Sequence, residues 1–261
     1  MGKCLGIFDS GFGGLTVLKE LLKKERFDRF VYFGDTARVP YGPRDADTIR
    51  AFALQDMRFL LSQGVDELVV ACNTITAVAL DAIRAAAGVP VHGVIEPAAA
   101  AAAAATKNGR VGLLATQATI DNGAYVRSIR AQDPAIELTA AACPDFVTLV
   151  EAGLRSEDGA VAAACERYLA PVRAAGCDTV VMGCTHFPVL EPAIAAYFGP
   201  EVTLVSSGVE VAACMAGQSG CLAPRVDFFV SGDPAPFDEQ RRRFLPGPWA
   251  EDARRIDIER F

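Results

Sequence analysis

Short apolar runs alternate with longer amphipathic stretches along most of the chain. The apolar runs predict strands at Leu5–Phe8, Phe30–Phe33, Glu67–Ala71, Val91–Val94, Val111–Ala115, Thr179–Met182 and Thr203–Val205. The stretches with helical periodicity predict helices at Leu15–Lys24, Ala46–Gln63, Thr76–Ala87, Pro97–Ala105, Thr119–Ala131, Glu157–Ala175, Pro188–Phe198 and Phe237–Phe244. Such alternation is typical of parallel strands joined by crossover helices, so the sequence predicts an α/β fold.

An internal repeat indicates two related halves. The segment GVDELVVAC at 64–72 returns as GCDTVVMGC at 176–184, and LGIFDS at 5–10 is echoed more weakly by VGLLAT at 111–116. The two echoes have nearly the same offset. We therefore expect two pseudo-symmetric three-layer α/β domains with mainly parallel sheets and an active site in the cleft between them. The first domain would comprise 1–95 plus 208–261, and the second 96–207.

Composition and charge narrow the functional classes. Hydrophobic residues make up 51% of the chain, which is enough for a buried core and excludes a disordered protein. The net charge of −7, with only Arg241–Arg243 as a basic run, argues against nucleic acid as a partner. The apolar run Ala98–Ala105 is too short to span a membrane. Residues 1–8 lack the features of a signal peptide, so we expect a cytoplasmic protein with no membrane association.

The cysteines do not form a metal-binding pattern. Eight are present, Cys4, Cys72, Cys143, Cys165, Cys177, Cys184, Cys214 and Cys221, and no two are spaced as C-x-x-C. His92 and His186 are the only histidines. A zinc site is therefore not expected. In a reducing compartment a disulfide framework is not expected either.

The repeat places two cysteines at equivalent positions. Each ends a predicted strand and precedes a helix, in the motifs CNT (Cys72) and CTHFP (Cys184). Ligands of parallel sheets bind beyond the carboxyl ends of the strands. The amino terminus of the following helix is expected to lower the pKa of a thiol there. Two such thiols are candidates to face one ligand from opposite sides; the alternative is that both are small core residues.

Other candidates follow neighbouring strands. The turn Asp9–Gly14, DSGFGG, lacks the dinucleotide fingerprint because Thr16 occupies the third glycine position, and it is either an anion-friendly turn or a helix cap. His186 is a candidate proton relay for Cys184, unless it faces water. Tyr41, in the turn PYGP, lines the cleft or only shapes the turn. Thr116 and Thr119 bind a carboxylate or cap a helix.

Two thiols around one ligand, without a cofactor motif or metal motif, predict racemisation or epimerisation by proton transfer. One thiolate removes the Cα proton and the thiol on the other face returns one. The carbanion requires donors around the adjacent carboxylate. Suitable donors are Ser10, Asn73, Thr74, Thr116, Thr119 and Thr185.

At these residues the chain resembles the glutamate racemases of the cofactor-independent aspartate/glutamate racemase group. The matching segments are GIFDSGFGGLTVLKEL, YFGDTARVPYGPR, VVACNTITAVAL, VHGVIEPA, ACPDFVTLVEAG, VVMGCTHFPVL and VSSGVEVA, which span 6 to about 212. GCTH, rather than GCTE, favours glutamate over aspartate.

The resemblance implies a role for each matching residue. Cys72 and Cys184 would be the acid/base cysteines, facing the D- and L-enantiomer respectively. Asp9 would assist Cys72, and His186, with Glu151 nearby, would assist Cys184. Thr148, where the family often has proline, makes the Glu151 assignment less direct. The residues in contact with substrate would be Asp9, Ser10, Tyr41, Gly42, Asn73, Thr74, Thr119, Thr185 and His186.

The implied activity is the interconversion of L- and D-glutamate without cofactor or metal. It would supply D-glutamate for peptidoglycan synthesis, and so for cell-wall biogenesis and cell shape. A homodimer is common in the family. Three alternatives remain open at this point: a relative acting on aspartate or another acid, an amino-acid-binding protein without chemistry, and a thiol redox protein using the same two cysteines.

Overall fold

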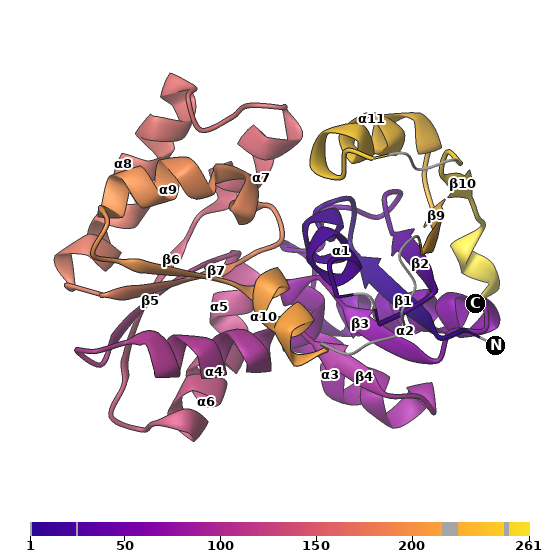
Figure 1. Cartoon of the computed structure of the whole chain (residues 1–261), viewed down its shortest axis with the longest axis horizontal. Helices are drawn as coiled ribbons and strands as arrows, with labels where there is room; N and C mark the ends of the chain where they lie inside the picture. The colour runs from indigo at the N-terminus through magenta and orange to yellow at the C-terminus, as the bar shows by residue number, and fades with distance from the viewer. Residues whose placement is uncertain (1, 25, 216–223, 248–250) are drawn as a thin grey trace.

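The chain folds into two α/β halves, each built on its own parallel sheet (Figure 1). The computed structural model describes all residues except 1, 25, 216–223 and 248–250. Cys221, one of the eight cysteines, lies outside the described residues. Both ends of the chain lie on the half that contains the first sheet.

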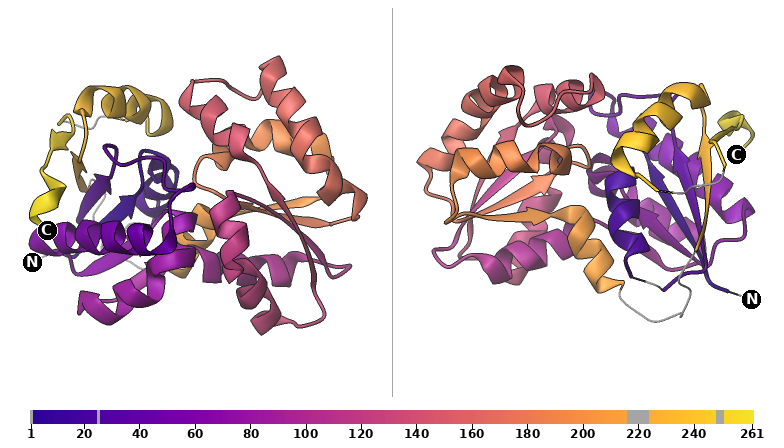
Figure 2. Two further views of the ribbon diagram at one scale, coloured as in Figure 1. Left: turned by 180° about the vertical axis from the view of Figure 1, so that it is seen from behind. Right: turned by 45° about the horizontal axis from the view of Figure 1, so that its top comes forward.

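The first sheet has six strands in the order β10-β9-β2-β1-β3-β4, all parallel. Their bounds are β1 Cys4–Asp9, β2 Arg29–Gly34, β3 Glu67–Val70, β4 Val91–Gly93, β9 Arg225–Val230 and β10 Arg254–Arg255. Helices α1 (Leu15–Leu22) and α11 (Pro234–Phe244) cover one face, while α2 (Ala46–Ser62) and α3 (Asn73–Ala87) cover the other (Figures 1 and 2). A short turn of helix, η2 (Ile258–Arg260), follows β10.

The second sheet has four parallel strands in the order β6-β5-β7-β8. Their bounds are β5 Arg110–Ala115, β6 Glu137–Ala142, β7 Thr179–Gly183 and β8 Thr203–Ser206. One face is covered by α7 (Pro144–Glu151), α8 (Gly159–Ala174) and α9 (Glu191–Phe198), with η1 (Phe187–Leu190) before α9. The other is covered by α4 (Ile95–Ala105), α5 (Gln117–Asn122) and α6 (Ala124–Gln132). Helix α10 (Ser207–Cys214) packs between α1 and α4.

The topology confirms the two related halves predicted from the repeat. The order β2-β1-β3-β4 in the first sheet corresponds to β6-β5-β7-β8 in the second. The echoed segments also share their register: Leu5 pairs with Glu67 across β1 and β3, and Val111 pairs with Thr179 across β5 and β7. The boundaries at 95/96 and 207/208 fall in the first turns of α4 and α10 and stay a prediction.

Several elements differ from the sequence prediction. Strands β6, β9 and β10 and helices α7 and α10 were not predicted. The single helix expected over Thr119–Ala131 is two helices, because Gly123 adopts a left-handed conformation (φ 71°) that ends α5 and begins α6. Strand β9 was not predicted because charged residues interrupt its apolar run. Its Asp227 is nevertheless buried, because it pairs with Arg29, Arg225 and Arg254.

Candidate active site

The two repeated cysteines line one cavity between the halves. Cys72 is the N-cap residue of α3, and Cys184 follows β7 directly. Each side chain is only 7% exposed, and both contribute to a cavity of about 440 Å³. Because β3 and β7 are equivalent strands of the two sheets, the duplication brings the thiols to the same space from opposite halves.

Most of the predicted site residues line this cavity. Besides the cysteines, they are Ser10, Tyr41, Gly42, Asn73, Thr74, Glu151, Thr185 and His186. Asp9 and Thr119 are fully buried and lie behind the lining. The wall also includes residues that were not predicted, among them Val39, Gln117, Pro144 and Val147. Val39 lies in a loop, Gln117 is the first residue of α5, and Pro144 and Val147 belong to the missed helix α7.

The Cys72 thiol lies in a buried and negatively charged environment. Its Sγ is 3.8 Å from Ser10 Oγ, and the carboxylate of Asp9 lies behind the same turn. Burial, reinforced by the charge of Asp9, raises the pKa of Cys72 to about 12, although the Ile75 N–H and Ser10 act in the opposite direction. The N-terminus of α3 thus acts on this thiol in the expected direction, but burial and Asp9 outweigh it, so the expectation of a lowered pKa is wrong for Cys72. A thiol with a pKa raised this far is protonated at neutral pH.

The Cys184 thiol has a basic neighbour instead. His186 Nδ1 lies 3.8 Å from Cys184 Sγ, and its Nε2 lies 3.4 Å from Glu151 Oε1. Burial acts to lower the pKa of His186, but the hydrogen bond to Cys184, the contact with Glu151 and the charge of Asp9 raise it to about 10. The imidazole is thus protonated at neutral pH and is within reach of the thiol.

The glycine-rich turn of the first half contacts the second half directly. Thr185 Oγ1 donates to Asp9 Oδ1 at 3.4 Å, and Thr16 Oγ1 donates to the Thr185 carbonyl at 2.9 Å. At Gly13 a Cβ would lie 2.4 Å from Thr185 Oγ1 and 2.7 Å from the His186 ring. Only glycine permits this approach, so the turn at 9–14 positions the Cys184 side rather than binding a dinucleotide.

Three threonine hydroxyls form a polar cluster on another wall. Thr74 Oγ1 lies 3.0 Å from Thr116 Oγ1 and 3.3 Å from Thr119 Oγ1, and the last two are 2.9 Å apart. Thr116 also caps α5 through its side chain. Thr74 and Thr116 face the cavity and Thr119 supports them from behind.

Tyr125 is a residue that the sequence did not single out. Its hydroxyl donates to Asn73 Oδ1 at 2.7 Å, and the Asn73 amide donates to Ser207 Oγ at 3.2 Å, so the orientation of Asn73 is fixed from both sides. The Tyr125 ring also packs close to Gly183, next to Cys184. No motif surrounds Tyr125 in the sequence, and only the tertiary structure brings it to both cysteines.

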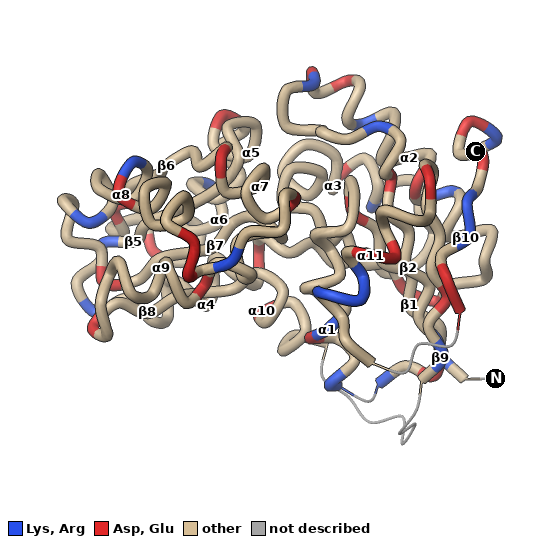
Figure 3. The backbone as a smooth tube through the Cα atoms, turned by 90° about the horizontal axis from the view of Figure 1, so that it is seen from above, with Lys and Arg blue, Asp and Glu red and all other residues tan. Residues whose placement is uncertain are grey.

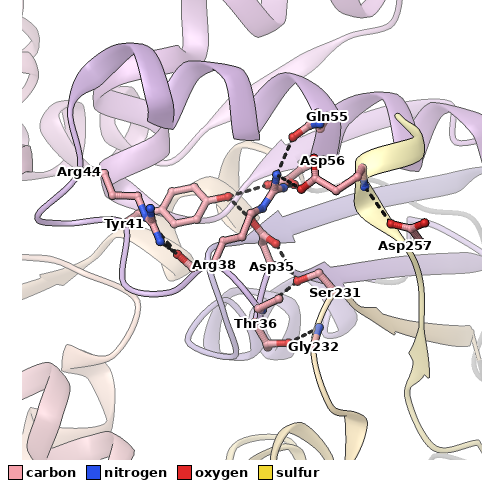
Figure 4. Close-up of polar contacts among 12 residues, drawn as sticks. Asp35, Thr36, Arg38, Tyr41, Arg44, Gln55, Asp56, Ser231, Gly232 and Asp257 are labelled. Atoms are coloured by element: carbon pink, nitrogen blue, oxygen red, sulfur yellow. Dashed lines mark hydrogen bonds and ion pairs between the residues drawn. The ribbon is translucent and has the colours of Figure 1, made fainter.

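Tyr41 turns its hydroxyl away from the cavity. The phenol is 2% exposed and donates to the carboxylates of Asp35 and Asp56 (Figure 4). What the loop 39–43 offers to a ligand is therefore its backbone and the space at Gly42, where a Cβ would meet nothing within 4 Å.

Positions of charged residues are distributed along the backbone of both halves (Figure 3). Among the described residues there is no group of three or more His, Cys, Asp or Glu side chains arranged to hold a metal ion. Within the same residues, no helix has the length and apolarity needed to cross a membrane. The expectations of no cofactor and no nucleic-acid partner stay predictions.

Comparison with known proteins places this fold and cavity in a family. The family model described as Asp/Glu/Hydantoin racemase matches residues 16–216. The glutamate racemase of Geobacter metallireducens is 45% identical over 253 residues, covering 94% of this chain and 93% of that protein. The chain therefore belongs to the Asp/Glu/hydantoin racemase family and is an isomerase.

Solved structures agree with this assignment. Glutamate racemase isoform RacE1 from Bacillus anthracis superposes with a TM-score of 0.90 at 35% identity, covering 98% of this chain and 97% of that one. The glutamate racemase from Francisella tularensis in complex with D-glutamate has a TM-score of 0.90 at 29% identity and covers 99% of both chains.

Proposed function

We propose that the protein interconverts L- and D-glutamate by a two-base mechanism in which Cys72 and Cys184 act on opposite faces of Cα. The observation that carries the proposal is that these two thiols come from equivalent strand ends of the two halves and line one cavity. The similarity to glutamate racemases, one of them solved with D-glutamate, supports glutamate as the substrate.

The two thiol environments suit the direction from L- to D-glutamate. Cys184, as thiolate, takes the Cα proton of the L-enantiomer, and the thiol of Cys72 delivers its proton to the other face. This leaves Cys184 as thiol and Cys72 as thiolate. The His186 imidazolium, whose Nδ1 lies 3.8 Å from Cys184 Sγ, is placed to act as the counter-ion of the Cys184 thiolate, and reversal of the two cysteine roles gives the reaction from D to L.

The carbanion formed between the thiols needs preorganised donors. The free N–H groups at the start of α3 and the hydroxyls of Ser10, Thr74 and Thr185 surround the cavity and are oriented by the contacts described above. Asp9 holds the Thr185 hydroxyl and raises the basicity of the thiolate of Cys72. Glu151 orients His186 through its Nε2 side.

The direct test incubates the reduced full-length protein with L-glutamate and no added cofactor, and follows D-glutamate by chiral chromatography. Cys72→Ala and Cys184→Ala should each abolish turnover, whereas Cys177→Ala, which removes another buried free thiol outside the cavity, should retain it. Racemisation by either cavity variant at the wild-type rate would overturn the mechanism. Turnover of aspartate but not glutamate would keep the mechanism and change the substrate.

The wider role follows from this activity. We propose that the D-glutamate supplies peptidoglycan synthesis, and thereby cell-wall biogenesis and cell shape, in the cytoplasm. A homodimer is the assembly that the family resemblance favours. Depletion of the protein should produce a cell-wall defect that external D-glutamate corrects, and a defect unaffected by D-glutamate would contradict this role.

A further inference from the structure

A cluster of buried charges lies behind the loop 39–43, outside the cavity. Asp35 and Asp56 are fully buried, and the side chain of Arg38 is only 10% exposed. Arg38 Nε donates to Asp35 Oδ2 at 2.6 Å and its Nη2 donates to Asp56 Oδ1 at 3.0 Å (Figure 4). The guanidinium also lies 4.0 Å from the centroid of the Phe52 ring. We call Asp35, Arg38, Tyr41 and Asp56 the carboxylate cluster.

The cluster connects three separate parts of the first half. Asp35 follows β2, Asp56 lies in the middle of α2, and Ser231, which donates to Asp35 Oδ1 at 2.7 Å, follows β9. The same Ser231 Oγ also accepts a hydrogen bond from the Ala37 N–H at 2.9 Å. These anchors belong to the rigid sheet and its covering helix, so the groups that meet the loop have fixed positions.

The loop itself has no regular structure to hold it. Residues 38–41 are in neither helix nor strand. Among the described residues, the backbone N–H groups of Tyr41 and Gly42 have no protein acceptor, and both residues line the cavity. Arg38 on one side and the Tyr41 hydroxyl within the loop are its attachments to the sheet and to α2.

Burying this cluster carries a desolvation cost in the free energy of folding. One guanidinium faces the two buried carboxylates, and its Nη1 also lies 3.5 Å from the exposed carboxylate of Glu259. The burial of Asp56, together with the charge of Asp35, raises the pKa of Asp56 well above its ordinary value although Arg38 opposes this. Apolar side chains at these positions would fill the same space without that desolvation cost. What they would not supply is a directional hold on the Tyr41 hydroxyl.

We propose that the carboxylate cluster is a positioning device that holds the Tyr41–Gly42 backbone against the cavity, so that its N–H groups bind a carboxylate of the substrate. Asp35, Arg38 and Asp56 act through Tyr41 and do not touch the substrate. The assignment of the substrate rests on the proposed function, whereas the positioning of the loop does not.

The proposal separates substrate binding from proton transfer. The loop N–H groups do not take part in proton transfer, so we expect them to bind the substrate equally well in the ground state and in the transition state. Loosening the loop should therefore raise KM and leave kcat nearly unchanged. Tyr41→Phe removes the hydroxyl but keeps the ring, and should raise KM for glutamate roughly tenfold. Asp56→Ala should do the same. Asp56→Asn still accepts from Arg38 and should remain close to wild type.

A matched control is available in the same sheet. Asp227 is equally buried and paired with arginines, but it does not line the cavity or contact the loop. Asp227→Ala should lower Tm without changing KM. Gly42→Ala tests the premise that the substrate reaches the loop: its Cβ has open space in the protein alone, so Tm should hold while KM rises.

A second readout does not depend on activity. Arg38 and Arg44 flank the loop. Loss of a Tyr41 anchor should loosen the backbone between them, so limited trypsin digestion should cleave after Arg44, whose side chain is exposed, faster in Tyr41→Phe and Asp56→Ala than in wild type or Asp227→Ala. If wild type fails to racemise glutamate while this cleavage pattern holds, the proposed function fails and the positioning device stands. Unchanged KM and unchanged cleavage in Tyr41→Phe, which preserves packing, would overturn the inference even if Asp56→Ala failed to fold.

Discussion

The two halves present their cysteines in the same way but surround them differently. Cys72 and Cys184 end equivalent strands, and both are 7% exposed. Behind Cys72 lies the carboxylate of Asp9, and the pKa of this thiol is raised to about 12. Beside Cys184 lies the His186 ring, whose own pKa is raised to about 10.

The duplicated fold places the two thiols, whereas residues that differ between the halves set the charge around each thiol. The repeated strand–cysteine unit supplies two thiols on opposite sides of one space. The residue two positions after each cysteine is Thr74 in one half and His186 in the other, so only Cys184 has a titratable group there. A two-base racemase needs one thiol and one thiolate at the start of each turnover, and unlike neighbours provide this difference.

Among the residues that surround the two thiols, the largest effect is expected from removing the imidazolium beside Cys184. His186→Gln should lower kcat/KM by about 10²–10³-fold, equally in both directions because the enantiomers have equal free energy. Proton removal at Cys184 should then limit the rate, so the primary deuterium isotope effect with Cα-deuterated substrate should grow for L-glutamate more than for D-glutamate. Equal isotope effects in both directions would show that His186 does not serve the Cys184 side.

The next largest effect is expected where Gly13 of the first half contacts Thr185 and His186 of the second half. Gly13→Ala would place a Cβ 2.4 Å from Thr185 Oγ1 and against the His186 ring, which must shift. A displacement of this order should lower kcat/KM by about a hundredfold. Gly159→Ala, where a Cβ meets nothing within 4 Å, is the matched control and should leave activity intact. Wild-type kinetics in Gly13→Ala would mean that the turn does not position His186.

The raised pKa of His186 predicts a pH-dependent stability. The imidazolium stabilises the folded state fully below the ordinary pKa of 6.5, and this contribution is lost as pH rises toward about 10. The difference in free energy of unfolding between wild type and His186→Gln should therefore fall by a few kcal/mol, in order of magnitude, over that range. Urea titrations at several pH values measure it. A difference that stays constant or grows with pH would contradict the assignment.

The smallest effect is expected at Tyr125, which supports both sides at once. Tyr125→Phe removes the hydrogen bond to Asn73 Oδ1 but keeps the ring near Gly183. One buried hydrogen bond corresponds to about 1 kcal/mol, so kcat/KM should fall roughly fivefold to tenfold with little change in Tm. Ser207→Ala, which acts on the other side of the same amide, should give a similar loss. Steady-state kinetics of both variants decide whether the orientation of Asn73 matters.

The sequence predicted the parts of the fold whose signal is local. The seven predicted strands correspond to β1–β5, β7 and β8. Most of these strands are apolar and buried along nearly their whole length, and the repeat predicted the paired topology. Strand β6 was missed because, at the edge of the sheet, it has only Ala141 buried and carries no run of large apolar residues. Strand β9 was missed because its Asp227 is neutralised by arginines from β2, β9 and β10, which no local window contains.

The same distinction between local signals and tertiary contacts applies to the residues of the site. Cys72, Cys184 and His186 follow strand ends and were visible as motifs, whereas Tyr125 and Asp56 act through contacts between distant segments. The pKa of Cys72 was misjudged for a related reason. The helix terminus is local, but burial and the charge of Asp9 come from the tertiary fold.

The most direct measurement of the two-base claim is deuterium incorporation in heavy water at low conversion. L-glutamate is converted to about a tenth of equilibrium, the enantiomers are separated, and Cα deuterium is measured in each. Two thiols on opposite faces predict D-glutamate that carries solvent deuterium while the remaining L-glutamate keeps its protium. Deuterium entering both enantiomers at the same rate, or D-glutamate that retains the original proton, would contradict the account.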